Sequence, residues 1–589
     1  MNIMVLLVIS TTFFQILTVA PLLEIITKKF KRNSLEIDKD DSPGMVIAFN
    51  LLILSTIYYL SCRFGATGHQ AGLIVSFYLL TNLLIESRAT NGFKFIFNNL
   101  FKHGIHVMIA IFQILPAIVK LSQANVILGA ATTGNNDISS YALVSKAFLL
   151  EGFDSANLIA GVDLNSFAET SAYQTPNFLI SFLATFFDNS PLRVMILVQV
   201  IALTFVSLCF YELVRHLAPK ANSNFLRIMS SFIMFFPLNN YIVANYFLAH
   251  ILSLGVLTLL LFKLLKLKQS YCFRNVLEVS LIFALNIYVY PPVALPLFVI
   301  FCLVIFVASY ESLEDILKFS QKLIEALILG LIITAPYLMT SINLLRAQSE
   351  VLAGWPIPAM SPMALLVWPQ LIGWVLPFAS IVVLWLFTFL AFFLGTRKFS
   401  DADVQRFLYV IVTTFVLVFI LYLKLSNRDI SDYQSWKLQS FFVCIIIIIA
   451  LSSTVSIKTL GTPILFIVIG LLSSTPMIEW WPALNARNNV SSQASLTINN
   501  DLQINSLKVV NVDVSPYFKT MNLASELLNS NKTVYLNSQS YYTSSSNLSA
   551  CTIVDNSDLR SSFGRQINIE FTLIPSEDKS CDPFVDFLK

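Results

Sequence analysis

Charged side chains are scarce in this chain of 589 residues, of which 12% are Asp, Glu, Lys or Arg and 56% are hydrophobic. A soluble protein of this size carries about 25% charged residues, so an ordinary soluble fold is excluded. Apolar runs long enough to cross a bilayer, roughly 20 residues each, recur along most of the chain. The composition therefore predicts a polytopic α-helical membrane protein surrounded by a lipid bilayer. The net charge of +3 gives no reason to expect nucleic acid as a partner, because the basic residues lie between the apolar runs.

Residues that bind metals or form disulfides are also few. The sequence has seven cysteines and five histidines, with no C-x-x-C pair and no Cys/His cluster. No metal site and no bound cofactor are therefore expected. The use of a divalent metal ion in a reaction catalysed by the protein is left open. The cysteines in or beside apolar runs are expected to be small apolar fillers: Cys62, Cys209, Cys272, Cys302 and Cys444. Cys551 and Cys581 lie in the polar C-terminal region, where they can pair in an oxidising compartment.

The amino terminus lacks the marks of a signal peptide. Residues 1–26 have no basic stretch before the apolar run and no small-residue cleavage site, so we expect a retained span. Hydropathy predicts about 14 transmembrane helices, near residues 3–27, 45–62, 71–87, 104–121, 191–213, 227–238, 241–262, 276–290, 292–309, 324–342, 374–395, 407–423, 438–456 and 460–476. Those between 227 and 309 are interrupted by "FPLNNY" and "YVYPP". Broken spans are tolerated only where protein or a water-filled cavity covers the freed backbone.

Loops rich in Lys and Arg alternate with nearly neutral loops along the chain, and this alternation predicts which loops lie on which side of the membrane. Most of these Lys and Arg residues fall in the loops 28–44, 88–103, 214–227, 263–275, 310–323, 396–406 and 457–459. The positive-inside rule places these loops in the cytoplasm. The amino terminus and the loops 122–190, 343–373 and 424–437 are then expected on the outer side, together with the C-terminal region.

The composition changes near residue 477. The segment 477–589 is rich in Asn and Ser, with short β-like runs followed by a pattern of helix, turn and strand in "YFKTMNLASELLNSNKTVYLNS". We expect residues 1–476 to form the transmembrane domain. Residues 477–589 are expected to form a small, soluble, extracytoplasmic α/β domain, in which Cys551 and Cys581 form a disulfide.

The longest predicted loop, 122–190, contains a polar stretch with helical periodicity. In "ISSYALVSKAFLLEGF", Tyr141, Val144, Ala147 and Phe148 form one helical stripe, which predicts a helix lying on the membrane surface. Asp137 comes just before it and has two interpretations. It is either an N-cap, for which Asp is a favoured residue, or a catalytic base at the mouth of a membrane cavity.

The loop 424–437, "KLSNRDISDYQSWK", breaks the charge pattern because it carries basic residues on the predicted outer side. A bound anion would explain them. Lys437 is suited to contact a phosphate as a point charge, and Arg428 can add a bidentate contact. The alternatives are that Lys437 only extends to the membrane interface and that Tyr433 is an interface anchor.

Polar residues also occur within the interrupted spans. "NNYIVANYFLAH" contains Asn240, Asn245 and His250, and "YVYPP" contains Tyr290. Polar groups at membrane depth usually face a cavity or the interior of the bundle. These residues are expected either to line a cavity or to have a structural role only.

Several of these stretches together resemble the GT-C class of membrane glycosyltransferases. They are the outward loop with Asp137 and "LLEGF", the segment "YQTPNFLISFLATFF" (173–187), and the stretches 236–254, 288–292 and 433–437. The resemblance implies transfer of a sugar from a polyprenyl-phosphate carrier to a cell-envelope glycan or lipid, on the outer face and with inversion. It implies that Asp137 is the acceptor base and that Lys437, Arg428 and Tyr433 lie at the donor phosphate. Asn136 stands where some members have a second acid, which speaks against a metal-dependent variant.

Other classes remain open beside the glycosyltransferase. A transporter or flippase of a lipid-linked saccharide would account for the spans and the broken helices. A polymerase or ligase of envelope polysaccharide also works on the outer face, and a non-catalytic subunit of an envelope complex is a further alternative. For the glycosyltransferase we expect a multi-pass protein of the bacterial inner or plasma membrane.

Overall fold

The computed structural model describes a chain that is largely helical. The described residues are 42–89, 93–123, 129, 137–157, 173–187, 189–235, 239, 242–243, 246–308, 312–351, 410–414, 417, 432–455, 509–513, 523–525, 527–528, 533–536, 551–555, 565–566 and 571–574. The chain divides into two compact units. Unit 1 comprises Met1–Ile53, Tyr78–Ile114 and Gln199–Trp480, and unit 2 comprises Leu54–Phe77, Leu115–Val198 and Trp481–Lys589.

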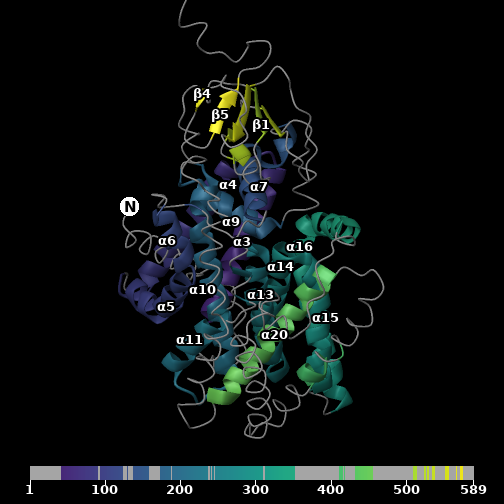
Figure 1. Cartoon of the computed structure of the whole chain (residues 1–589). Coiled ribbons are helices and arrows are strands. Elements are labelled where there is room, and N and C mark those ends of the chain that lie inside the picture. Colours follow the sequence, from purple (N-terminus) through teal and green to yellow (C-terminus); the bar gives the residue numbers. More distant parts are fainter. Residues whose placement is uncertain are drawn as a thin grey trace, which may run out of the picture. The chain divides into compact units, whose positions relative to one another are not determined.

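The described part of unit 1 is a helical bundle. It contains the first part of α3 (Pro43–Arg63), the second part of α4 (Gly68–Ala89), α5 (Phe93–Gln113), most of α10 (Pro191–Leu217), α11 (Ser223–Phe232), the short η2 (Ile233–Phe235), α13 (Leu248–Gln269), α14 (Phe273–Val289), α15 (Pro291–Ala308), α16 (Leu313–Val351) and α20 (Asp432–Val455). Figure 1 shows α13, α14, α15, α16 and α20 side by side, and the packed helix pairs within this group agree with that view. Packing of α5 on α11 extends the bundle.

Helices α13 and α14 form an antiparallel hairpin closed by residues 270–272. The amide Nδ2 of Asn275 donates to the carbonyl oxygens of Ser270 at 2.8 Å and Lys266 at 3.2 Å, so the side chain satisfies carbonyls at the end of α13. Glycines allow close approach on both sides of this hairpin. A Cβ on Gly255 would lie 2.8 Å from the Phe205 ring of α10, and one on Gly330 of α16 would lie 2.8 Å from the Phe283 ring of α14.

Helix α16 carries many large apolar side chains on its outside. Its buried residues combine the large Phe319, Tyr337 and Leu344 with smaller ones such as Ala326 and Thr334, whose hydroxyl donates to the carbonyl of Gly330. Its outer face instead carries exposed Leu, Ile and Met: Leu317, Ile324, Ile328, Leu331, Ile332, Met339 and Ile342. In water this arrangement would expose a large apolar patch. It is the arrangement expected of a helix whose outer face contacts lipid.

Four of the described helices are long and apolar enough to cross a membrane: Pro43–Arg63, Pro191–Leu217, Leu248–Gln269 and the segment Leu313–Arg346 of α16. Shorter apolar helices are His103–Gln113, Pro296–Ala308 and Ser440–Ser452. The described part of the chain is therefore that of a helical protein with membrane-type helices. The predicted spans 3–27, 374–395 and 460–476 lie outside the described residues, as does most of 407–423, so the total of about 14 stays a prediction.

Some predicted span boundaries are wrong. The span predicted near 104–121 is interrupted, since α5 ends at Gln113 and α6 (Leu115–Gln123) follows with Pro116 in its first turn. Pro116 has no N–H with which to continue the preceding helix. The span predicted near 241–262 begins later, at Leu248. Tyr246 just before it has φ of 60°, a backbone conformation that ends regular helix in non-glycine residues.

Unit 2 combines helices with a sheet. Its helical part holds the remaining ends of α3, α4 and α10 together with α6, α7 (Asp137–Glu151), η1 (Gly152–Asn157) and α9 (Gln174–Ala184). Its strands are β1 (Val509–Asp513), β2 (Thr533–Leu536), β3 (Cys551–Asp555), β4 (Arg565–Gln566) and β5 (Phe571–Ile574), in the order β2-β1-β3-β5-β4. Strand β1 pairs in parallel with β2 and β3, whereas β5 pairs antiparallel with β3 and β4.

The parallel strands β1 and β2 require a crossover between them. Helical residues at 523–525 lie in that connection, and Leu523, Ala524, Leu527 and Leu528 are buried. The described strands therefore fall in the region where sequence composition predicts β structure. That residues 477–589 form a separate α/β domain stays a prediction.

Candidate functional site

Asp137 is the first residue of α7 and is half-buried. At this position the carboxylate lies beside the unpaired N–H groups of the first helical turn, where a negative charge is favoured by the helix dipole. Both interpretations of Asp137, as a cap of this helix and as a catalytic base, stay open at this position. The helix that follows is buried on most of its surface, which fixes where the carboxylate lies.

The prediction that α7 is a surface helix is wrong. Its stripe of Tyr141, Val144, Ala147 and Phe148 is buried, but so are the residues on its other faces, including Ser139, Ser145 and Lys146. Burial of Ser145 and Lys146 is possible because each has a hydrogen-bond partner within unit 2.

Helix α9 supplies some of these partners. The Ser145 hydroxyl lies 3.1 Å from Oδ1 of Asn177, and the Ser181 hydroxyl donates to the carbonyl of Ser145 at 2.8 Å. The ammonium of Lys146 donates to the carbonyl of Asn189 at 2.7 Å. Sequence periodicity does not show these pairs, because the partners lie more than thirty positions apart, with |i−j| of 32, 36 and 43.

The "LLEGF" motif has a structural role at the end of α7. Gly152 has φ of 58°, and a Cβ at this position would meet the carbonyl oxygen of Ala66 at 2.5 Å. The ring of Phe153, the next residue, packs under the guanidinium of Arg63, whose Cζ lies 4.1 Å from the ring centroid. A Cβ on Gly68 would likewise lie 2.5 Å from the carbonyl oxygen of Phe148. The start of α4 and the end of α7 are therefore in close backbone contact.

His250 and Tyr290, predicted to line a cavity, are brought together. Their ring centroids are 6.2 Å apart, and the His250 ring also stacks on Phe441 at 4.9 Å. Nε2 of His250 lies 2.8 Å from the hydroxyl of Ser440, and both rings are buried. His250 thus connects α13, α14 and α20. Asn240 and Asn245 lie outside the described residues, and a cavity here stays a prediction.

One turn before Tyr290, the side chain of Asn286 is fully buried in α14. Among the described residues neither its Oδ1 nor its Nδ2 has a hydrogen-bond partner. An unpaired buried amide is costly, about 1–3 kcal/mol, so such a group indicates either strain or a polar partner that the chain itself does not supply.

The predicted donor-phosphate residues are only partly described. Residues 432–437 belong to α20, so the second half of the predicted 424–437 loop is helical. Tyr433 and Lys437 lie about one turn apart along this helix, and Arg428 lies outside the described residues. The predicted 343–373 loop also begins as helix, since α16 continues to Val351. Cys551 lies in β3, whereas Cys581 is outside the described residues, so their disulfide stays a prediction.

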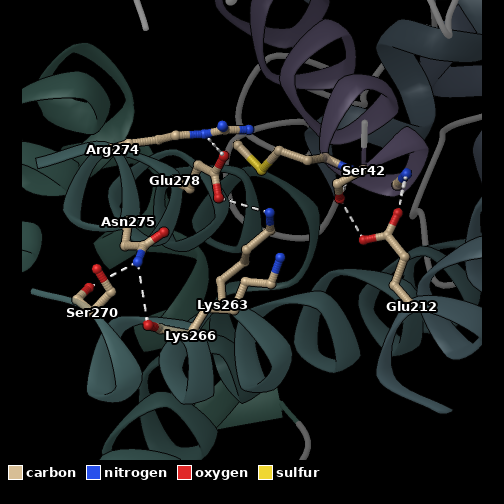
Figure 2. A network of polar contacts seen from close by, with 10 residues as sticks. Ser42, Glu212, Lys263, Lys266, Ser270, Arg274, Asn275 and Glu278 are labelled. Atoms are coloured by element: carbon tan, nitrogen blue, oxygen red, sulfur yellow. Dashed lines mark hydrogen bonds and ion pairs between the residues drawn. The ribbon is translucent and has the colours of Figure 1, made fainter. Parts of the chain in front are cut away.

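A charged network that the sequence reasoning missed lies where α13 meets α14 (Figure 2). Nζ of Lys263 is 2.7 Å from Oε2 of Glu278, and Nε of Arg274 is 3.0 Å from Oε1 of the same carboxylate. Lys263 and Glu278 are both buried. The charge pattern of the sequence places Lys263 in the basic loop 263–275, whereas the structure places it inside α13. A pair of opposite charges on either side of a short hairpin connection is the sequence feature that indicates such an ion pair.

Figure 2 also shows Glu212 of α10, which binds the start of α3. Its Oε2 accepts from the Ser42 hydroxyl at 2.5 Å, and its Oε1 accepts from the backbone N–H of Gly44 at 2.7 Å. A Cβ on Gly44 would lie 3.0 Å from that same Oε1. Glu212 therefore acts as a distant cap for α3, and its role is structural.

Metal ligands are not gathered in the described part of the chain, where no group of three or more His, Cys, Asp or Glu side chains is placed to hold an ion. A comparison of the sequence with protein families and with curated proteins finds no match in either.

Proposed function

We propose that this chain is a membrane glycosyltransferase. It moves a sugar from a polyprenyl-phosphate carrier to a cell-envelope glycan or lipid on the outer face of the bacterial inner or plasma membrane, with inversion. The observation that carries the proposal is the half-buried carboxylate of Asp137 at the start of a helix that is itself buried. A general base must be held in one position relative to the proton that it takes, and a buried helix provides such a support.

The chemistry needs two kinds of group. Transfer from a phosphate ester passes through an oxocarbenium-like state, as other glycosyl transfers do. Asp137 would take the proton from the acceptor hydroxyl while a cation stabilises the departing phosphate. For that cation we propose Lys437 and Arg428, with Tyr433 beside the donor phosphate. Direct attack on the carrier-linked sugar inverts the anomeric carbon.

The proposed architecture follows the charge pattern of the sequence. Residues 1–476 form the transmembrane domain with about 14 spans, and residues 477–589 form an extracytoplasmic domain. The apolar helices of the described residues, and the Leu- and Ile-rich outer face of α16, support the membrane location. The loop that contains Asp137 lies on the same side as the extracytoplasmic domain in this scheme.

The test is the substitution Asp137→Asn. Asn keeps nearly the same shape but cannot accept a proton, so turnover should fall by roughly 10²-fold while the protein remains folded. Glu151→Gln and Asp154→Asn at the other end of α7 are matched controls, since each removes one carboxylate charge from the same helix or the turn that follows it. Transfer from a polyprenyl-phosphate sugar is measured with purified protein, with the thermal stability of each variant checked in parallel. Near-normal transfer by Asp137→Asn would limit this residue to a helix-stabilising role.

A second candidate is a transporter or flippase of a lipid-linked saccharide. The buried and unpartnered amide of Asn286 favours it, because a polar cargo inside the bundle would supply the missing hydrogen bonds. Reconstituted vesicles separate the two functions. A transporter moves the labelled saccharide across the bilayer without a change in its chemical linkage, whereas a transferase releases the carrier phosphate from the sugar.

A further inference from the structure

A second buried polar cluster lies in unit 1, where α5, α10 and α11 meet, and includes none of the residues described so far. Its centre is the fully buried ring of His106 on α5. Nδ1 of His106 is 2.7 Å from the hydroxyl of Ser207 on α10 and 2.9 Å from that of Ser231 on α11. The two hydroxyls are 2.6 Å apart, and Ser231 donates to the carbonyl of Arg227 at 2.8 Å.

One distribution of protons uses all of these contacts and gives a tautomer for His106. In it Ser231 donates to the Arg227 carbonyl, which also accepts from the Ser230 hydroxyl at 3.0 Å, and Ser207 donates to Ser231. Nδ1–H of His106 then donates to Ser207, and Nε2 of the neutral ring is an acceptor. We adopt this distribution.

Three side-chain atoms around the His106–Ser207–Ser231 cluster have no hydrogen-bond partner among the described residues. They are Nε2 of His106, the hydroxyl of Tyr211 and Nε of Arg227. Tyr211 contacts both other side chains. Its ring centroid is 5.7 Å from the ring centroid of His106 and 5.5 Å from the Cζ of Arg227. The three unpartnered atoms thus belong to one cluster.

The chemistry of these atoms defines what would satisfy them. Arg227 is a cation whose Nη1 contacts a neutral partner, Oδ1 of Asn224 at 3.3 Å, and within the described residues no carboxylate neutralises it. Its Nε–H and the Tyr211 hydroxyl are donors suited to the oxygens of an anion. In the adopted tautomer, Nε2 of His106 is an acceptor and needs a donor. A single ligand that meets all three has an anionic group next to a hydroxyl group.

We propose that His106, Tyr211 and Arg227 bind a phosphate ester that also carries a hydroxyl group. Arg227 and Tyr211 donate to the phosphate oxygens, and the ligand hydroxyl donates to Nε2 of His106. Such a ligand is either a lipid headgroup, as in phosphatidylglycerol, or a soluble ester such as glycerol 3-phosphate. Arg227 is half-exposed near the start of α11, and Met108 and Phe112 of α5 are exposed apolar side chains, which suits entry from a membrane.

The test titrates the purified full-length chain with phosphatidylglycerol by native mass spectrometry. The wild type should retain the lipid at a fixed stoichiometry, and Arg227→Gln should weaken its binding about tenfold or more. Lys220→Gln is the control, because it removes one positive charge from the exposed loop just before α11. Equal binding by wild type and Arg227→Gln, or an equal loss in both variants, would show that only general surface charge attracts the lipid, and the proposal would be wrong.

Two further variants separate the contacts. Tyr211→Phe removes only a hydroxyl without a described partner, so it should weaken lipid binding while leaving the melting temperature of the lipid-free protein unchanged. A lower melting temperature would mean that the hydroxyl is already bonded in the protein, which contradicts the site. His106→Asn can keep the donor to Ser207 and lose the acceptor. It should weaken phosphatidylglycerol but not the methyl ester of phosphatidic acid, which has a phosphate and no hydroxyl. An equal effect on both lipids would refute the hydroxyl contact.

A competition experiment distinguishes the lipid headgroup from the soluble ester as the ligand of this site. Displacement of phosphatidylglycerol by glycerol 3-phosphate at similar concentration assigns the site to the soluble ester. Retention of the lipid under the same conditions assigns it to the membrane headgroup.

Discussion

The buried charges of the α13–α14 hairpin predict an unequal response to substitution. Glu278 contacts two cations, whereas Lys263, at 2% exposure, has Glu278 as its hydrogen-bonded counterion. Glu278→Gln would leave the ammonium of Lys263 buried without its hydrogen-bonded counterion, with Glu212 as the remaining described carboxylate that interacts with it electrostatically. Breaking a buried ion pair in this way costs about 3–5 kcal/mol of unfolding free energy.

The opposite substitution should cost less. In Lys263→Met the carboxylate of Glu278 keeps its contact with Arg274 at 3.0 Å, and Arg274 is 39% exposed and so remains partly hydrated. The loss is one charge-assisted hydrogen bond, about 1.5–3 kcal/mol, and it is offset in part because an ammonium no longer has to be dehydrated. The double variant Lys263→Met/Glu278→Leu replaces the pair by apolar groups and should be close to the wild type in stability.

These variants are compared by titration of purified protein in mixed micelles with a denaturing detergent. The expected order of midpoints places the wild type and the double variant highest, Lys263→Met next and Glu278→Gln lowest. Lys318→Met is the control, since its partner Glu314 and Lys318 itself are exposed, and it should leave the midpoint unchanged. If Glu278→Gln unfolds no earlier than Lys263→Met, the account of a buried lysine that has lost its counterion does not hold.

Three further outcomes can be measured. Gly68→Ala should lower the unfolding free energy by about 1–3 kcal/mol, because its Cβ would meet a backbone carbonyl of α7 at 2.5 Å, whereas the helical control Gly104→Ala has open space around it and should not destabilise. Cys551 and Cys581 should appear as one disulfide-linked peptide pair in mass spectra of non-reduced protein from its native membrane; two free thiols would contradict both the pairing and the outer placement. Lys437→Ala should weaken binding of a polyprenyl-phosphate sugar by about 1.5–3 kcal/mol without a change in acceptor binding, and unchanged donor affinity would make this residue an interface anchor.

The sequence predicted helices where one property repeats over many residues. The apolar runs near 45–62, 191–213 and 324–342 correspond to α3, α10 and α16, because about twenty apolar residues are helical in any membrane fold. Boundaries failed where a single residue decides them, as at Pro116 and at Tyr246 with its positive φ.

The candidate site was less predictable because its contacts join distant segments. The stripe of α7 indicated one buried face, but burial of the other faces depends on Asn177 and Asn189, which periodicity within α7 does not reveal. The pairing of His250 with Ser440 has the same origin, with |i−j| of 190. A sequence shows which polar groups lie among apolar residues, but only the fold shows which of them are satisfied.

The α13–α14 hairpin also affects how the orientation of the chain in the membrane is inferred from its Lys and Arg residues. The charge pattern places Lys263 in the basic loop 263–275, yet it lies inside α13 and donates a hydrogen bond to Glu278. It therefore serves helix pairing and is weak evidence for orientation. Lys266, Lys268 and Arg274 remain close to the connection 270–272, and the positive-inside rule counts Lys and Arg near the ends of spans whether or not acids lie nearby. The assignment of this end to the cytoplasm thus keeps its basis without Lys263, and the stability test of the buried pair is independent of the topology.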